Sequence, residues 1–506
     1  MSASSILSRS EEPKDSESQR RQHSENLDDK QKFSREHRDY LIDRHGSYNL
    51  EPVPSFAGAD PYNWPYWKKL TNLLLVSFHA MTATFTAACI MPAFAYIAHD
   101  LHISIQQASY LTALQIAILG AAPLLWRPLS DRYGRRPIFL LSLLCSLIGN
   151  IGCAKSPSYS TLCLCRAIVA LFISPAIAIG SAVVTECFFR KSRGRYIGIW
   201  TLMVTLGIPV APLIFGPVAY HIGWRWIFWI LAVMNGVQFL LYFFLGPETL
   251  YVAHAGGGRG PDFKNKFLSF GRINPKPLRA VDFVHPLTMA SRACVLVPAI
   301  AYAMNFLMGS ILITVELPQL FVERFGLNPQ QIGLQFVGQI IGTLIGELLS
   351  GTASDYWMRW RTDPARVRPE RRLWLSYLGY LLTITGIVVF LVQLQNAHEG
   401  DWNVTPVIGA GIAAAGNQIV TTILITYAVD CYREESASVG VFITFVRQIW
   451  GFIGPFWFPS MFKSIGEANS AALCSCLVIA VSLAPTILLQ WMGPKWRARQ
   501  GSTDQS

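Results

Sequence analysis

Ten residues in the first third of the chain combine four charges with a glycine. They read Pro128-Leu-Ser-Asp-Arg-Tyr-Gly-Arg-Arg-Pro137 and separate two apolar segments. A carboxylate four residues before a guanidinium can accept charge-assisted hydrogen bonds from it, and such bonds can open when helices move. A second possible role for these charges is only to anchor the turn among lipid headgroups. The residues concerned are Asp131, Arg132, Gly134, Arg135 and Arg136.

Arg166 lies inside an apolar run, Leu162-Cys-Leu-Cys-Arg-Ala-Ile-Val-Ala-Leu-Phe172. A charge at the centre of a bilayer costs at least about 2.5 kcal/mol, so this side chain should face the protein interior or a wet cavity. Because arginine does not deprotonate in proteins, it can tune a neighbouring carboxylate or water, or hold an anionic group. The alternative is a structural arginine that backbone carbonyls satisfy.

Further polar groups within apolar segments could face a substrate. His79 can titrate near neutral pH, although a single buried histidine also serves as a packing residue. Glu316 could equally be interfacial, at the outer end of its segment. Asn417 and Gln418 are adjacent, about 100° apart on a helix, so only one of them should point straight into a cavity. The substrate-binding candidates are His79, Asn305, Glu316, Asn417, Gln418 and Arg447, and Glu347 is a further intramembrane polar residue.

The segments that position these groups are long and apolar. Of the 506 residues, 52% are hydrophobic and only 14% are charged, which is too apolar for a soluble protein of this length. Stretches of the ~20 residues that span a bilayer recur along the chain. We therefore predict an all-α membrane protein with twelve transmembrane helices, near 70–96, 107–127, 137–154, 161–187, 196–220, 226–246, 294–321, 331–353, 372–394, 405–429, 437–460 and 468–492.

The net charge of +11 is concentrated in alternate loops rather than in a nucleic-acid-binding patch. This asymmetry follows the positive-inside rule and places both termini in the cytoplasm. Residues 1–68 are rich in charge and serine, which predicts a disordered cytoplasmic tail. A short cytoplasmic tail should follow at 493–506. Asn403-Val-Thr is a glycosylation sequon on the predicted outer side, but its closeness to the next helix argues against its use.

The chain contains an internal repeat. Ser354-Asp355 matches Ser130-Asp131 at the end of the second helix of each half, and Val429-Asp430 echoes Thr185-Glu186 at the end of the fourth. This predicts two six-helix pseudo-repeats with a shared central cavity. The expected divisions are 69–246 for the N-terminal half, 247–291 for a central cytoplasmic loop, and 292–492 for the C-terminal half.

The 128–137 stretch resembles the loop between helices 2 and 3 of the major facilitator superfamily, roughly G-x-L-[AS]-D-R-x-G-R-[RK], with Arg127 in place of the glycine. Other matches resemble fungal twelve-helix drug:proton antiporters: Asp60-Pro-Tyr-Asn-Trp-Pro65, Gly223-Trp-Arg-Trp-Ile-Phe-Trp229, Pro247-Glu-Thr249 and Tyr427-Ala-Val-Asp430. Together they cover about 60–495. The resemblance implies the major facilitator fold, with the cavity lined by helices 1, 4, 7 and 10.

The resemblance also implies roles for particular residues. Arg166 matches the arginine of a helix 4 motif associated with proton coupling, although Val169 and Ala170 depart from that motif. The proline- and glycine-rich part of helix 5 resembles an antiporter motif, with Ala211 and Phe215 replacing two glycines; it holds Gly207, Pro209, Pro212, Gly216 and Pro217. A gate would involve Asp131, Arg132, Gly134, Arg135, Arg136, Glu186, Asp355 and Asp430.

We therefore expect a proton-coupled secondary transporter of the plasma membrane that exports small amphipathic compounds, such as drugs, toxins or secondary metabolites, by alternating access. The alternatives are a proton symporter importing a nutrient or organic cation, and a transporter-like membrane sensor. The sequence has no nucleophile–base pattern, metal-ligand spacing or phosphate-binding G-x-x-x-x-G-K-[ST] loop, so we expect no enzyme, metal or cofactor. Its expected partners are the substrate, protons and lipid, with the chain acting as a monomer.

Overall fold

The computed structural model describes residues 35–48, 50–251, 273–274, 277–359, 369–432 and 435–503, without the side chains of 35, 190–191, 352–359 and 498–503. Within these ranges all regular structure is helical. Twelve helical spans are long and apolar enough to cross a membrane, and each predicted segment overlaps one of them. The prediction of an all-α membrane protein with twelve spans is confirmed.

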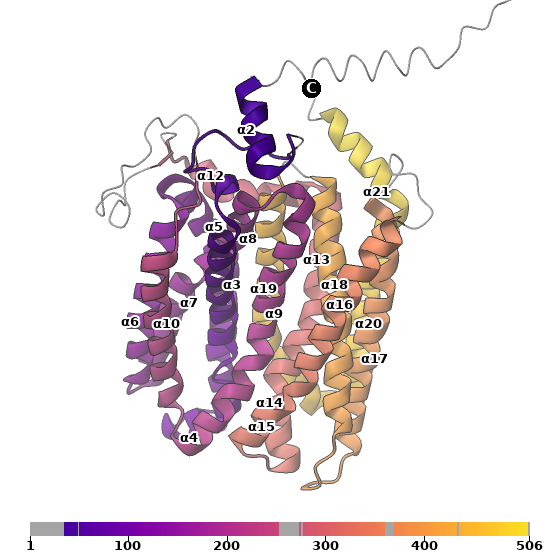
Figure 1. Cartoon of the computed structure of the whole chain (residues 1–506). Coiled ribbons are helices and arrows are strands. Elements are labelled where there is room, and N and C mark those ends of the chain that lie inside the picture. Colours follow the sequence, from indigo (N-terminus) through magenta and orange to yellow (C-terminus); the bar gives the residue numbers. More distant parts are fainter. Residues whose placement is uncertain are drawn as a thin grey trace, which may run out of the picture.

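The N-terminal half carries six spans that stand side by side (Figure 1). Proline residues mark two of the breaks within them, because a proline lacks the N–H that a helix interior needs. The elements before and within this half are α2 (Arg35–His45), η1 (Pro61–Asn63), α3 (Tyr66–Ala88), η2 (Met91–Ala93), α4 (Phe94–Asp100), α5 (Ile105–Tyr133), α6 (Arg135–Ala154), α7 (Tyr159–Ile173), α8 (Pro175–Cys187), α9 (Arg190–His221) and α10 (Arg225–Leu245).

The C-terminal half repeats this arrangement. Two of its spans contain a π-helical turn, η4 and η7, a feature that often marks functional sites. The elements are α12 (Ala280–Val284), η3 (His285–Ser291), α13 (Ala293–Phe306), η4 (Leu307–Leu312), α14 (Ile313–Phe325), α15 (Pro329–Gln335), α16 (Val337–Arg359), η6 (Pro369–Leu373), α17 (Trp374–Asn396), α18 (Thr405–Cys431), α19 (Ser436–Ile465), α20 (Glu467–Val478), η7 (Ile479–Leu483) and α21 (Ala484–Thr503).

Both α2 and the C-terminal end of α21 lie at one end of the bundle, which we call the tail side, whereas α4 and α15 lie at the opposite end, the far side (Figure 1). The two halves meet where α5 packs on α19 and where α9 packs on α15 and α16. At the far side Gln106 donates to the Pro455 carbonyl at 2.6 Å, and the rings of Tyr110 and Phe456 stack at 4.5 Å. The halves are therefore closed against each other on that side.

The structure differs from the expected disordered tail over 1–68. Residues 1–34 lie outside the described part, but an ordered segment begins with α2. Leu41 is fully buried, the Phe56 ring contacts His37, and Arg44 donates to the carbonyl of Asn63. A few contacts of this kind order a segment whose overall composition is too polar to form a core of its own. Of the central loop, residues 252–272 and 275–276 also lie outside the described part.

Candidate substrate cavity and gate

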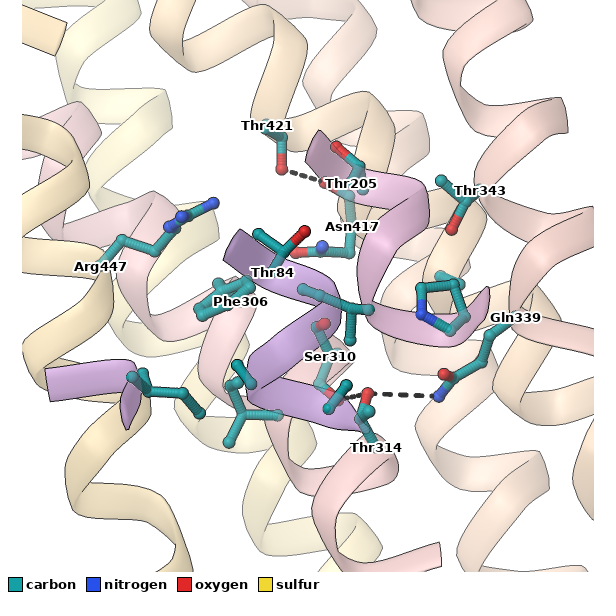
Figure 2. A pocket seen from close by; sticks show the side chains of 18 of the residues that line it. Thr84, Thr205, Phe306, Ser310, Thr314, Gln339, Thr343, Asn417, Thr421 and Arg447 are labelled. Atoms are coloured by element: carbon teal, nitrogen blue, oxygen red, sulfur yellow. Dashed lines mark hydrogen bonds between the residues drawn. The ribbon is translucent and has the colours of Figure 1, made fainter. Parts of the chain in front are cut away.

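A central cavity of about 70 Å³ lies between the two halves. It collects side chains from α3, α5 and α9 of the first half and from α13, η4, α14, α16, α18 and α19 of the second (Figure 2). Drug-sized ligands occupy sites of roughly 300–1,000 Å³. The cavity must therefore widen before such a compound fits.

The lining combines hydroxyl and amide groups with apolar surface. Gln339 donates to the Thr314 hydroxyl at 3.4 Å. Arg447 is the charged residue among those that line the cavity; it donates to the Tyr302 hydroxyl at 2.9 Å and lies over the Phe306 ring at 4.7 Å. A lining of this kind suits compounds that pair apolar bulk with a few polar groups. The residues labelled in Figure 2 are Thr84, Thr205, Phe306, Ser310, Thr314, Gln339, Thr343, Asn417, Thr421 and Arg447.

Three of the six substrate candidates line this cavity, namely Asn417, Gln418 and Arg447. Both Asn417 and Gln418 of α18 thus reach the cavity wall, whereas their spacing on a helix predicted that only one of them would. Asn305 is buried one layer behind and donates to the Asn417 side-chain oxygen at 3.1 Å. Gln418 donates in turn to Glu347 at 2.7 Å, so a carboxylate stands directly behind a lining amide.

The other two candidates, His79 and Glu316, are buried away from the lining residues. His79 shares a hydrogen bond with the Ser142 hydroxyl at 3.1 Å and packs against the Phe139 ring. Glu316 is 1% exposed, and its Oε1 has no hydrogen-bond partner among the described residues. A buried carboxyl without a charge partner is costly unless it is protonated, so Glu316 is a group that can hold a proton inside the C-terminal half.

Arg166 is buried in α7 at 1% exposure, facing the end of α3. Its Nη2 lies 3.4 Å from the carbonyl oxygens of Thr86 and Ala87, and its guanidinium lies over the Phe228 ring. These are long bonds for a guanidinium, and its Nε has no described partner. The structure therefore gives Arg166 carbonyl and aromatic neighbours rather than a carboxylate.

The proline- and glycine-rich part of helix 5 continues as one helix, α9, through Pro209, Pro212 and Pro217. Its glycines allow close approach at both ends of the segment. A Cβ at Gly207 would meet the Met81 carbonyl of α3 at 2.6 Å, and a Cβ at Gly216 would meet the Pro329 carbonyl of α15 at 2.6 Å. The second contact crosses between the halves on the far side.

On the tail side, Arg135 lies at the centre of a charge cluster. Its guanidinium donates to Asp131 at 2.6 Å, to Glu186 at 2.8 Å and to the Ser130 hydroxyl at 2.6 Å. Gly134 has φ 101°, a conformation that favours glycine. Arg136 donates to the Phe243 carbonyl, and the Arg132 carbonyl accepts N–H groups from Ile273 and Asn274.

Glu248 completes this cluster, and sequence reasoning missed it. Its carboxylate accepts the backbone N–H groups of Arg135 at 2.9 Å and Arg136 at 3.1 Å, the first residues of α6. Burial raises the pKa of the Glu248 carboxyl, while the N–H groups of Leu250, Arg135 and Arg136 act in the opposite direction. The neighbouring Thr249 hydroxyl donates to Glu186 at 2.7 Å. The available signal was the Pro247-Glu-Thr249 motif, which we used only as a family marker.

The second half has its own pairs on this side. Asp430 lies 3.5 Å from Arg372, and Glu370 lies 2.8 Å from Arg497. The side chain of Asp355 lies outside the described part.

At the far side, the Asn403 side chain accepts from the N–H and hydroxyl of Thr405, at the start of α18. The described residues contain no group of three potential ligands that could hold a metal ion.

Comparison with known proteins decides the family. The model of the Major Facilitator Superfamily matches residues 76–455, three quarters of the chain. This chain belongs to the major facilitator superfamily. The predicted family is thereby confirmed, and the chain is a membrane transporter rather than an enzyme.

Relatives within the superfamily carry related descriptions. The efflux pump radE of Floropilus chiversii is 25% identical over 452 residues, which cover 86% of this facilitator and 82% of the relative. The probable efflux pump mfs2 of Aspergillus flavus is 26% identical over 431 residues, covering 81% and 99%. A crystal structure of the peptide transporter POT with alafosfalin matches with a TM-score of 0.64 and 14% identity over 87% of this facilitator and 98% of that chain. At that identity the last likeness shows a shared fold alone.

Proposed function

We propose that this facilitator exports small amphipathic compounds, such as drugs, toxins or secondary metabolites, in exchange for protons. The observation that carries the proposal is the central cavity, which both halves line with amides, hydroxyls, aromatic rings and one guanidinium. Two relatives that cover most of this chain are described as efflux pumps, which supports export. No cofactor enters the proposal, because a proton gradient supplies the energy.

Alternating access follows from the closed far side. A site between two halves is exposed to one side at a time when the halves rock against each other. In the present conformation the far side is held by the contact of α9 with α15 and by the stacking of Tyr110 on Phe456. We propose that the cavity widens as these contacts open, and that the Arg135 cluster forms the gate on the tail side.

Proton coupling needs an acid that can bind and release a proton within the membrane, which arginine cannot do. Glu316 and Glu347 are the candidates in the spans of the C-terminal half; Glu316 is buried outside the cavity lining, and Glu347 reaches the cavity through Gln418. Arg166 has no described carboxylate partner, so its proposed role is to organise the carbonyl end of α3. We propose that Glu316 carries the proton, because its buried oxygen lacks a partner that would fix its charge.

The positive-inside asymmetry supports placing the tail side, with both termini, in the cytoplasm. We propose that the protein acts as a monomer in the plasma membrane. This orientation sets the direction of the experiment, because inverted vesicles then expose the tail side to the medium.

The test uses inverted membrane vesicles energised to be acidic inside. A panel of amphipathic toxic compounds is first screened for those to which deletion of the gene increases sensitivity. Accumulation of such a compound in the vesicles, collapsed by a protonophore, is the expected result. Acid-stimulated uptake into intact cells, with no change in sensitivity on deletion, would instead establish a symporter. Absence of any transport, with signalling lost on deletion, would establish a sensor.

A further inference from the structure

A second cavity, of about 390 Å³, lies on the tail side, away from the residues that line the central cavity. It is an open cavity between the segment that precedes the first span and the junction between α8 and α9. Arg44 and Lys69 bring positive charge to it, and its lining contains no carboxylate. The lining residues are Arg44, His45, Asn63, Trp64, Pro65, Tyr66, Lys69, Phe188, Phe189, Ser192 and Tyr196.

The basic groups are held in place by the turn η1. Arg44 donates from Nε and Nη2 to the Asn63 carbonyl at 3.2 and 2.6 Å, and the His45 ring is bonded to the Asn63 side chain at 3.0 Å. Lys69 donates to the Tyr62 carbonyl at 2.8 Å. The carboxylate of this turn, Asp60, accepts from the N–H groups of Ser55 and Tyr62. The hydrogen bonds that fix Arg44 and Lys69 therefore go to neutral carbonyls, whereas Asp60 acts on Lys69 through space.

The hydrogen-bond donors that remain available in this cavity suit an anion. A guanidinium has five N–H donors and an ammonium three, and the bonds to Asn63 and Tyr62 use only some of them. The positive charges of Arg44 and Lys69, brought to one cavity, repel each other, and an anion with several oxygens relieves that repulsion. A phosphate group meets both needs, because it is multiply charged and accepts several charge-assisted hydrogen bonds.

The surroundings of the cavity indicate which kind of molecule would carry the phosphate. Lys69 lies in the first turn of a membrane span that begins at Tyr66. Tyr66 and Trp67 are 60% and 66% exposed there, as expected for aromatic residues in contact with lipid headgroups. The rings of Phe188 and Tyr196 stack at 3.7 Å along another wall. This combination of fixed cations and aromatic surface at the membrane edge suits a phospholipid better than a free phosphate ion.

We propose that this cavity binds the phosphate headgroup of an anionic membrane lipid. A bound headgroup would connect the start of α3 with the start of α9. The Tyr62 hydroxyl donates to the Thr185 carbonyl, one residue before Glu186, so the turn beside the cavity is bonded to the helix that carries a member of the gate cluster. The proposal goes beyond the proposed export function and holds for any transported compound.

The experiment counts lipids bound to the purified full chain by native mass spectrometry in neutral detergent. The probes are dioctanoyl phosphatidic acid, dioctanoyl phosphatidylcholine and inorganic phosphate. We compare the wild type with Arg44→Gln, with the double variant Arg44→Gln/Lys69→Gln and with Arg195→Gln. Arg195 is exposed close to the cavity without lining it, so its variant matches the single loss of positive charge in Arg44→Gln.

We expect one phosphatidic acid to bind the wild type, and phosphatidylcholine not to bind at that stoichiometry. The double variant should bind phosphatidic acid about tenfold more weakly or worse, because charge-assisted bonds are lost. The Arg195 variant should bind as the wild type does. Ser192→Glu adds a carboxylate to the lining and leaves the bonds to Asn63 in place, so it should weaken binding as much as the double variant does. It replaces the double variant in the test if that variant does not fold.

Three results would overturn the proposal. The first is equal binding of phosphatidylcholine. The second is unchanged binding in both the double variant and Ser192→Glu. The third is displacement of the lipid by millimolar inorganic phosphate, which would assign the cavity to a soluble phosphate compound instead of a lipid.

Discussion

Replacing Gly216 with alanine should open the far side of the transporter. A Cβ on Gly216 would lie 2.6 Å from the Pro329 carbonyl oxygen and 3.2 Å from the Gly333 Cα. Ordinary van der Waals contact begins near 3.4 Å. The nearer atoms are backbone and cannot rotate away, so α9 and α15 must separate by roughly 0.8 Å. Overpacking of this kind costs about 1–3 kcal/mol.

That cost applies only to the conformation in which α9 and α15 touch. If the halves alternate as proposed, the opposite conformation separates these helices and avoids the clash. The equilibrium between the two should then shift by a factor of about 5 to 150 toward the far-side-open conformation. Alanine also gains up to about 1 kcal/mol of helix propensity over glycine, but both conformations share that gain.

The assay measures how fast an impermeant maleimide labels Tyr110→Cys on the far side; this change is present in every variant compared, so the loss of its stacking on Phe456 is common to all of them. The chain without this substitution provides the background from its native cysteines. Gly198→Ala is the matched control, because a Cβ at Gly198 in the same helix meets nothing within 4 Å. We expect faster labelling and slower transport for Gly216→Ala but not for Gly198→Ala. Equal labelling of the two variants would refute the far-side closure.

Four further outcomes are expected. Asp131→Asn should nearly abolish transport at normal membrane abundance, measured by vesicle uptake and surface labelling; near-normal uptake would rule out a gating role. Arg166→Lys should restore little activity, because lysine lacks the planar fork that spans the carbonyls of Thr86 and Ala87, and an unchanged pH profile would reduce Arg166 to a generic positive charge. Glu316→Gln should remove the dependence of transport on the pH gradient while Glu347→Gln retains it, and the reverse pattern would assign the proton to Glu347. Glu248→Gln should lower the free energy of unfolding by about 1–3 kcal/mol, read from thermal unfolding in detergent, because the amide nitrogen cannot accept a backbone N–H; an unchanged melting temperature would contradict the capping role.

The fold could be predicted because its signals are local. Each span is an apolar run of sufficient length, and the charged loops between the runs repeat between the two halves. The pair of Asp131 and Arg135 also follows from closeness in sequence, because Gly134 turns the chain between the end of α5 and the start of α6. These features need no knowledge of which segments meet in space.

The parts that could not be predicted depend on contacts between distant segments. Glu248 caps the start of α6 from more than a hundred residues away. Gly216 looked like part of a proline-rich motif, yet its neighbours are the backbone atoms of α15 in the other half. His79 illustrates the converse, because this polar residue of an apolar helix packs inside the N-terminal half, where its Nε2 meets the hydroxyl of Ser142 on a neighbouring helix. Composition alone could not distinguish these environments.

The arrangement of the Arg135 cluster refines how the proposed gate would work. The side-chain partners described for Arg135, namely Ser130, Asp131 and Glu186, belong to the N-terminal half, as does the Glu248 carboxylate that caps its helix. Rocking of one half against the other would therefore not break these bonds by itself. Their exposures differ, however: the Asp131 side chain is 48% exposed, whereas those of Arg135 and Glu186 are 6% and 22% exposed.

Asp131 is therefore the member that can reach toward the second half when the tail side closes, while Arg135 and Glu186 fasten the ends of α6 and α8. On this reasoning, Glu186→Gln should lower the stability of the N-terminal half in every conformation, because it removes one partner from a buried guanidinium. Asp131→Asn should leave stability nearly unchanged and act on the conformational equilibrium. Melting temperature together with far-side labelling separates the two effects, and similar losses of stability in both variants would show that the whole cluster is only structural.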